Sequence, residues 1–326
     1  MCAGSFCIPV SSGEYLIAMT DEILNRILPP RVYAALATLG ADKLCEVRLR
    51  SGGAVSVSYG GRYGYVTPRG VTDTPENAVV LGSDEVERVL LLACEKSLYA
   101  FNDRICRGFI TLAGGIRIGV AGETVWEGSA VKTVKNIAAL NIRIPHEVLG
   151  CGERAIALLR RGNGFHSTLV VSPPGAGKTT LLRDLARIAS SDKCVHNVLI
   201  ADERDEIAAS VNGRPSLRVG RNTDVISGCT KEYAFLSGIR ALRPDIIVTD
   251  ELCGAEDAAA VENAVYSGVC VFASVHAQSH TDLLSKTSMA SLLHNACFTR
   301  FIDISERNGP GTIEGVFDEN FCAVRP

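Results

Sequence analysis

A glycine-rich loop that ends in lysine and threonine is the clearest chemical feature of this sequence. It reads Ser172-Pro173-Pro174-Gly175-Ala176-Gly177-Lys178-Thr179, followed by Thr180. This is the Walker A pattern, in which the glycines let backbone N–H groups approach phosphate oxygens. Lys178 would place its charge beside the β- and γ-phosphates, and the Thr179 hydroxyl would ligate Mg²⁺. Ser172 stands where the pattern has its first glycine, and a chance glycine-rich turn is the alternative interpretation.

An acidic pair, Asp250-Glu251, follows the apolar run 246–249. About 70 residues after a phosphate loop, this pair is typical of a Walker B element. Asp250 would hold the Mg²⁺ shell through water, and Glu251 would polarise the attacking water. The alternative is an acidic pair in a solvated loop. The cofactors predicted from both motifs are ATP and Mg²⁺.

Three further residues are candidates. Glu203, in the pair Asp202-Glu203 after another apolar run, could align water or bind metal. It could equally belong to a helix N-cap, because Asp205-Glu206 follow at once. His276 follows the apolar run 269–275 and could sense a γ-phosphate, although a lone histidine is usually structural. Arg221 lies in the basic segment 213–222, which suits a mobile loop with a trans-acting arginine or a solvated loop.

Alternating apolar strands and helices in the second half of the chain must position these residues. The alternation predicts an α/β domain with a mainly parallel sheet covered on both faces. Strands are expected at 167–171, 197–201, 245–249, 269–275 and 301–304, and helices at 178–190, 232–242 and 255–266. The acidic pairs would then lie at the carboxyl edge of the sheet, where such sheets bind ligands.

The first half predicts a smaller α+β domain. Helices are expected at 21–28, 31–39 and 83 to about 99, with Ser83 as a cap. Strands are expected at 44–50, in a hairpin at 55–59 and 62–66, and as antiparallel strands across 108–144. A boundary near Gly150 divides the chain into domains 1–150 and 151–326, joined by a helix at 153–161.

Composition narrows the function classes. The chain has 326 residues, a net charge of −3 and 6% aromatic residues, which argues against nucleic acid as a partner. Its 12 cysteines include no C-x-x-C pair, so a zinc or iron–sulfur site has little support; buried free thiols in a reducing cytosol are expected. We see no signal peptide and no bilayer-spanning apolar run, so any membrane role needs a partner.

The stretch from 241 to 277 resembles the Walker B to His-box region of type II/IV secretion ATPases. It contains Arg243-Pro244-Asp245, the Walker B pair and Ala273-Ser274-Val275-His276-Ala277. The resemblance implies a RecA-like P-loop fold and makes His276 a γ-phosphate-sensing residue. It also places Asp202-Glu203 at the Asp box. Those ATPases often lack the Walker B aspartate, whereas this chain has it.

Nearly the whole chain resembles the stage III sporulation protein AA family. The resemblance rests on Glu46-Val47-Arg48-Leu49-Arg50, Gly114-Gly115-Ile116-Arg117-Ile118-Gly119, Asn141-Ile142-Arg143-Ile144-Pro145, the phosphate loop and Val219-Gly220-Arg221-Asn222-Thr223-Asp224-Val225. It implies a cytosolic mother-cell ATPase, peripheral to a membrane-embedded sporulation channel. It also implies a homo-oligomeric ring, expected to be a hexamer. Arg117 and Arg143 would be phosphate contacts from the N-terminal domain.

The leading hypothesis is a Mg²⁺-dependent ATPase motor that energises a secretion-like channel between mother cell and forespore. One alternative is a scaffold that assembles on ATP and turns over little. Another is a nucleic-acid-stimulated ATPase. The choice of ATP over GTP rests on the resemblance alone.

Overall fold

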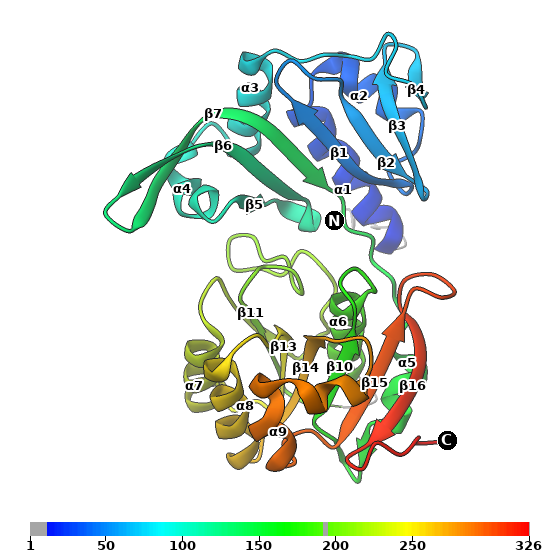
Figure 1. Ribbon diagram of the computed structural model, residues 1–326, viewed down its shortest axis with the longest axis vertical. Coiled ribbons are helices and arrows are strands. Elements are labelled where there is room, and N and C mark those ends of the chain that lie inside the picture. Colours follow the sequence, from blue (N-terminus) through cyan, green and yellow to red (C-terminus); the bar gives the residue numbers. More distant parts are fainter. Residues whose placement is uncertain (1–11, 192–194, 326) are drawn as a thin grey trace, which may run out of the picture. The chain divides into compact units, whose positions relative to one another are not determined.

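Figure 1 shows a computed structural model of the protein, which describes residues 12–191 and 195–325. The chain divides into two compact units, Met1–His146 and Glu147–Pro326. Within the described ranges, no helix combines the length and apolar character that a membrane span requires. Cys94 and Cys297 are buried free thiols, as expected, whereas Cys253 and Cys322 are exposed. Cys2, Cys7 and Cys194 lie outside the described residues, as do the first 11 residues of the segment in which a signal peptide was not expected.

The first unit is an antiparallel sheet with helices packed on one face. Its strands run in the order β4-β3-β2-β1-β7-β6-β5. Its elements are α1 (Ser12–Ile27), α2 (Pro30–Ala37), β1 (Leu44–Arg50), β2 (Ser56–Tyr59), β3 (Arg62–Thr67), β4 (Gly70–Thr72), α3 (Ser83–Ala93), α4 (Leu98–Cys106), β5 (Phe109–Thr111), the 3-10 turn η1 (Ala113–Gly115), β6 (Arg117–Glu127) and β7 (Ala130–Arg143).

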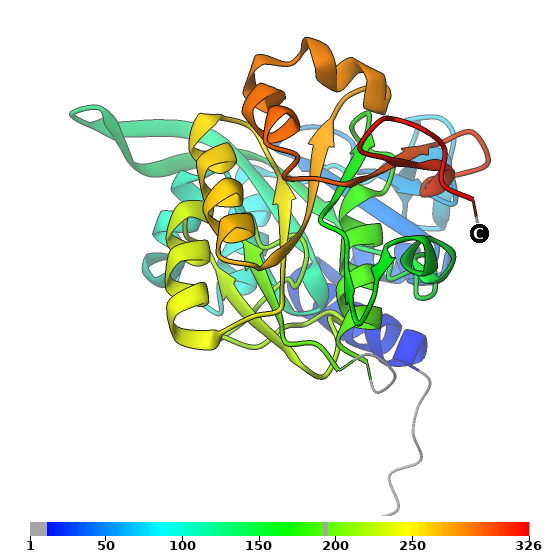
Figure 2. The same ribbon diagram turned by 90° about the horizontal axis from the view of Figure 1, so that it is seen from below.

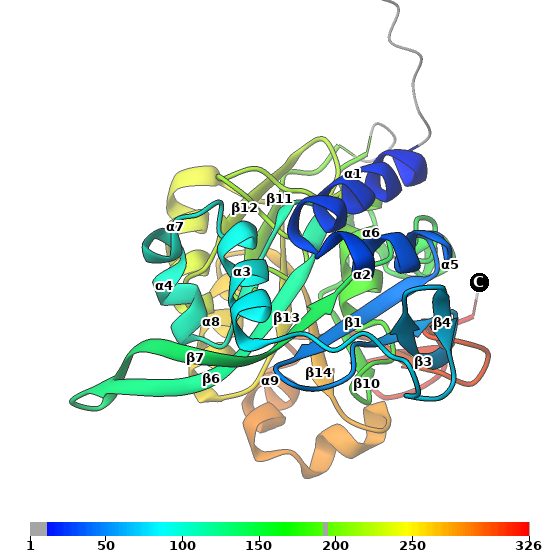
Figure 3. The same cartoon turned by 90° about the horizontal axis from the view of Figure 1, so that it is seen from above.

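Alternation along β1 and β7 creates the core of this unit. Val47 lies opposite Ile142 and Leu49 opposite Leu140, and all four side chains are buried. Helices α1, α2 and α3 cover this face with Ile27, Val32, Val86 and other apolar residues. Figure 3 shows these helices over the sheet and the β6–β7 ribbon projecting beyond it. The predicted α+β pattern and antiparallel strands of this half are confirmed.

Two helix predictions for the first unit are wrong. The helix expected from 83 to 99 is two helices, because Glu95 and Lys96 adopt left-handed backbone angles (φ of 51° and 65°). Ser83 is the first helical residue rather than the cap, which is Gly82. The carboxylate of Glu85 accepts the Gly82 N–H at 3.2 Å and completes that end.

The second unit is a mainly parallel sheet of order β12-β11-β13-β14-β10-β15-β16, in which only β16 pairs antiparallel. Its elements are α5 (Glu153–Leu158), β8 (Arg160–Arg161), β9 (Gly164–Phe165), β10 (Thr168–Ser172), α6 (Lys178–Ala189), β11 (Val198–Asp202), β12 (Thr223–Ser227), α7 (Lys231–Leu242), β13 (Ile246–Glu251), α8 (Ala255–Tyr266), β14 (Cys270–His276), η2 (His280–Ser285), η3 (Thr287–Met289), α9 (Ala290–His294), β15 (Arg300–Ser305) and β16 (Thr312–Asp318).

Helices cover both faces of this sheet, as predicted. Val170, Val248 and Phe272 pack with α5 and α6, whereas Leu169 and Val271 pack with α7, α8 and α9. Figure 2 shows α6 on one side of the sheet and α7, α8 and α9 on the other. Strands buried on both faces read as continuous apolar runs, which is why the sequence located them well.

Three features of the second unit differ from expectation. The linking helix expected at 153–161 ends at Leu158, and Arg160–Arg161 forms a short strand with Gly164–Phe165. Residues 203–210 form turns and bends rather than a helix, so the helix N-cap interpretation of Asp202-Glu203 is wrong. Strands β12 and β16, which carry little apolar alternation, were not predicted.

Candidate functional site

The glycine-rich loop joins β10 to α6 and forms a backbone cradle at the carboxyl edge of the sheet. Gly175 and Gly177 have φ values of 86° and 96°, which L side chains rarely adopt. A Cβ at Gly177 would lie 3.1 Å from the backbone nitrogen of Gly311, in the β15–β16 turn. That nitrogen donates to Ala176 O at 2.8 Å and braces the loop. A cradle with no room for a Cβ, at the start of a helix, fits phosphate.

Lys178 is buried at the first position of α6, with its ammonium turned into the loop. Its Nζ lies 3.2 Å from Ser172 O, 3.0 Å from Pro173 O and 3.2 Å from Ser172 Oγ. Ser172 therefore does more than turn the chain out of β10, because its hydroxyl helps to position the lysine. Burial lowers the pKa of Lys178 to about 8; Glu251 opposes this shift and Lys286 adds to it.

His276 and Glu251 continue from Lys178 as a chain of contacts. Residue 276 ends β14 directly beside Ser172, its register partner on β10. His276 Nδ1 lies 2.6 Å from Lys178 Nζ, and His276 Nε2 lies 3.1 Å from Glu251 Oε2. A charged Lys178 can only donate to Nδ1, so Nε2 carries the proton and donates to Glu251. The structure thus brings three predicted residues together from β10–α6, β13 and β14.

Asp250 is buried beside Glu251 but is paired with a lysine that the sequence did not single out. Lys231 Nζ lies 2.9 Å from Asp250 Oδ1 and 2.6 Å from Glu203 Oε2. Burial raises the pKa of Asp250 to about 6; Lys231 opposes the shift, and Asp202 and Glu203 add to it. Arg204, also missed, lies 3.8 Å from Glu251 Oε2. The spacing of residues along the sequence does not reveal these ion pairs, because the partners belong to different helices, strands and loops.

Asp202 has a structural role at the end of β11. Its buried carboxylate accepts the backbone N–H groups of Glu206 and Ala208, each at 2.8 Å, and that of Ile207 at 3.1 Å. It therefore organises the loop that follows, while the neighbouring Glu203 faces Lys231. Of the Asp202-Glu203 pair, Glu203 is the one that shares Lys231 with Asp250.

Arg221, the arginine predicted for the second unit, does not lie beside Lys178, Glu251 and His276 in its own chain. Arg221 precedes β12, whose first residue pairs with the first residue of β11. Arg221 is therefore exposed at the amino edge of the sheet, whereas Lys178, Glu251 and His276 lie at the carboxyl edge. In the first unit, Arg117 and Arg143 are cross-strand partners on β6 and β7.

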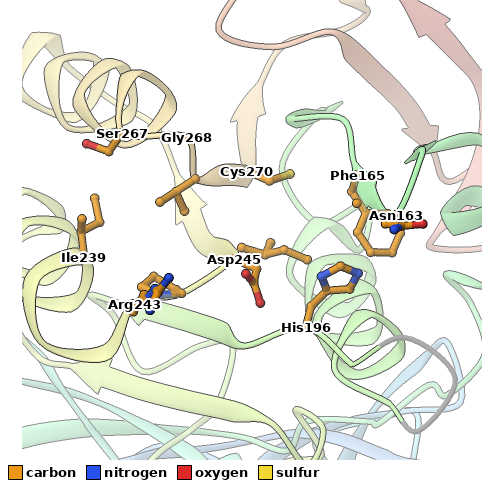
Figure 4. Close-up of a pocket in the computed structure, with 13 residues that line it drawn as sticks. Asn163, Phe165, His196, Ile239, Arg243, Asp245, Ser267, Gly268 and Cys270 are labelled. Carbon is orange, nitrogen blue, oxygen red and sulfur yellow. The ribbon is translucent and has the colours of Figure 1, made fainter.

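A cavity of about 530 Å³ also opens at the amino edge of the second unit. Figure 4 shows it between the ends of α7 and α8 and the β8–β9 turn, with Phe165, His196, Arg243 and Asp245 among its lining residues. None of the predicted site residues lines it.

The residues at the carboxyl edge fit a magnesium nucleotide on two observations. The first is the cradle around Gly175 and Gly177. The second is Asp250, whose Oδ2 is buried without a hydrogen-bond partner among the described residues. Thr179, in the first turn of α6, would offer a hydroxyl to Mg²⁺, and the carboxylate of Asp250 would suit its water shell. Thr180 lies in the same turn.

Comparison with known proteins supports both the family and the fold. Residues 19–324 match the family model described as sporulation stage III, protein AA. The chain is 32% identical over 305 residues to stage III sporulation protein AA of Bacillus subtilis (strain 168), covering 91% of this chain and 95% of that protein.

Solved structures show the fold. The ATPase DotB of Legionella pneumophila aligns with a TM-score of 0.54 at 13% identity, over 88% of this chain and 76% of that one. The pilus retraction motor PilT, solved with bound ADP, aligns with a TM-score of 0.53 at 15% identity, over 83% and 75%. The predicted RecA-like P-loop fold is confirmed.

Proposed function

Because the chain belongs to the stage III sporulation protein AA family, we propose that it is a Mg²⁺-dependent ATPase that energises a secretion-like channel between mother cell and forespore. The observation that carries the proposal is the Lys178–His276–Glu251 chain, with contacts of 2.6 Å and 3.1 Å. It links a phosphate-binding lysine to the carboxylate best placed to activate water.

Each residue has a defined task in this proposal. Backbone N–H groups of the loop bind the phosphates, and Lys178 turns from His276 towards the γ-phosphate. His276, freed from the lysine, would change tautomer by exchanging protons with solvent, losing the proton from Nε2 and gaining one at Nδ1, which donates to a γ-phosphate oxygen. Glu251, no longer bound by Nε2–H, would accept the proton of the attacking water. Bound Mg²⁺ would supply positive charge that offsets the charge of the phosphates. Thr179 would ligate it and Asp250 would hold it through water.

Steady-state phosphate release tests the proposal. We expect release by the wild type to fall at least about 100-fold in Glu251→Gln and in Lys178→Ala. Glu251→Gln should retain ATP binding because the cradle is intact, whereas Lys178→Ala should lose it. Glu256→Gln is the matched control, since this exposed acid in the first turn of α8 should leave the rate unchanged.

Equal rates in all variants would contradict the proposal. ATP-dependent assembly without turnover, measured with channel components present, would favour a scaffold instead. A rate that rises with single-stranded DNA or RNA would favour a nucleic-acid-stimulated ATPase.

A further inference from the structure

Lys231 is a buried cation that sits among carboxylates from three other elements. Its side chain is only 4% exposed, and its Nζ lies 2.6 Å from Glu203 Oε2, 2.9 Å from Asp250 Oδ1 and 3.8 Å from Asp257 Oδ2. These acids come from the end of β11, the end of β13 and the first turn of α8. A single ammonium thus joins α7 to the strand ends that carry the site.

Burial and the start of a helix both disfavour a positive charge at position 231. Lys231 is the first residue of α7, where the helix dipole is itself positive. Burial alone lowers the pKa of this lysine, but Asp250, Glu203 and Asp257 more than reverse the effect, and the pKa is raised. Lys231 is therefore charged, and the surrounding carboxylates offset the cost of burying it.

The carboxylate of Asp250 is buried, and Lys231 is the cation paired with it. Its side chain is 5% exposed, its Oδ1 depends on the ion pair with Lys231, and its Oδ2 has no hydrogen-bond partner among the described residues. Asp250 brings a buried carboxylate to the ammonium, and the partly exposed Glu203 brings a second one. Carboxylate oxygens are the ligands that Mg²⁺ prefers, and in this chain Lys231 lies between them.

We propose that Lys231 is a resident cation that stands in for a metal ion, so that the site does not bind Mg²⁺ until a nucleotide brings it. Lys231 is a positioning residue: it neutralises Asp250 and Glu203 and leaves the metal to be held chiefly by phosphate oxygens. The biological role of this arrangement rests on the proposed function. The effect of Lys231 on Mg²⁺ binding does not, and it can be tested without nucleotide.

The test is thermal unfolding of the full chain without nucleotide, at about pH 8, in chelator or in Mg²⁺ at about 5 mM. Lys231→Met keeps the length of the side chain and removes its charge. We expect Mg²⁺ to raise its midpoint by about 3 °C or more, whereas the wild type shifts by less than about 1 °C. Sodium chloride at equal ionic strength should not reproduce the gain. Arg240→Met removes an exposed charge from the same helix and should behave as the wild type.

The double variant Lys231→Met/Asp250→Asn provides a second test, which still distinguishes the outcomes if Lys231→Met folds poorly. Removing the uncompensated carboxylate should restore a midpoint above that of the single variant and abolish the response to Mg²⁺. The inference is overturned if Lys231→Met responds to Mg²⁺ no more than Arg240→Met, or if the double variant responds as the single one does. Loss of ATP binding or turnover in the wild type would count against the proposed function and leave this readout intact.

Discussion

At the scale of single residues, Lys178 connects the loop to the carboxylate that would activate water. Its ammonium is held by Ser172, Pro173 and His276, and burial lowers its pKa to about 8. A phosphate ligand would bind the charged form, so we expect phosphate binding and protonation of this lysine to be linked.

This linkage predicts a pH dependence of nucleotide affinity. The pKa of Lys178 is depressed, so the ammonium is present below pH about 8 and lost above it. Affinity for ADP with Mg²⁺ should therefore be highest near pH 7 and fall about tenfold or more by pH about 9.5. Calorimetric titration at both values measures it. Lys178→Arg, which stays charged, should give a flat profile; an equally flat profile in the wild type would refute the linkage.

Much of this site could be predicted from residue types, and some of it could not. Lys178, Glu251 and His276 end strands or begin a helix in a parallel sheet, and such ends meet at one edge. Lys231 and Arg204 act through partners from other elements, so no spacing along the chain reveals them. Arg221 is the opposite case: its basic loop suggested a site, but it precedes β12 and lies at the amino edge.

At the scale of elements, the loop between β10 and α6 depends on glycine for its shape. Gly177 has a φ of 96°, and a Cβ there would meet the backbone of Gly311 at 3.1 Å. The β15–β16 turn, which the sequence did not predict, thus packs against the loop through the backbone of Gly311.

Gly177→Ala should lower the free energy of unfolding by about 1–2 kcal/mol and weaken ADP binding at least about tenfold. Gly128→Ala is the matched control, because Gly128 has a φ of 64° and no atom within 4 Å of its added Cβ. It should show the backbone cost without the loss of binding. Urea denaturation and ADP titration measure the two effects. Similar binding losses in both variants would mean that the cradle has no special role.

Apolar runs predicted the buried strands of the second unit, because both faces of those strands are covered. Alternation of apolar and polar residues and a hairpin signal predicted strands of the first unit. The break between α3 and α4 escaped prediction for a physical reason. Glu95 and Lys96 adopt left-handed angles that usually call for glycine or asparagine, so nothing in the sequence marked the turn. The β12 and β16 strands are half-exposed, and their pattern is correspondingly weak.

At the scale of the whole molecule, we expect the proposed motor to work as more than one copy of the chain. Arg221 lies at the opposite edge of the sheet from Lys178 in its own chain, so a phosphate contact by Arg221 would have to come from a neighbouring subunit. The ring expected from the family resemblance would supply one.

We therefore predict that Glu251→Gln with ATP assembles into particles with a mass near six times 34.7 kDa. Light scattering after size exclusion measures this mass. The double variant Arg221→Ala/Glu251→Gln should keep ATP binding within about twofold. Arg221→Ala alone should reduce phosphate release. A monomeric mass with saturating ATP would rule out the ring under those conditions.

The central claim, that Glu251 helps to cleave a nucleotide bound by the Lys178 loop, is tested most directly by a single turnover. Enzyme in excess over γ-labelled ATP and Mg²⁺ is quenched at intervals, and the bound nucleotide is identified. The account predicts that wild type converts its bound ATP to ADP and phosphate, whereas Glu251→Gln retains intact ATP over the same period. Equal conversion by both proteins would contradict it.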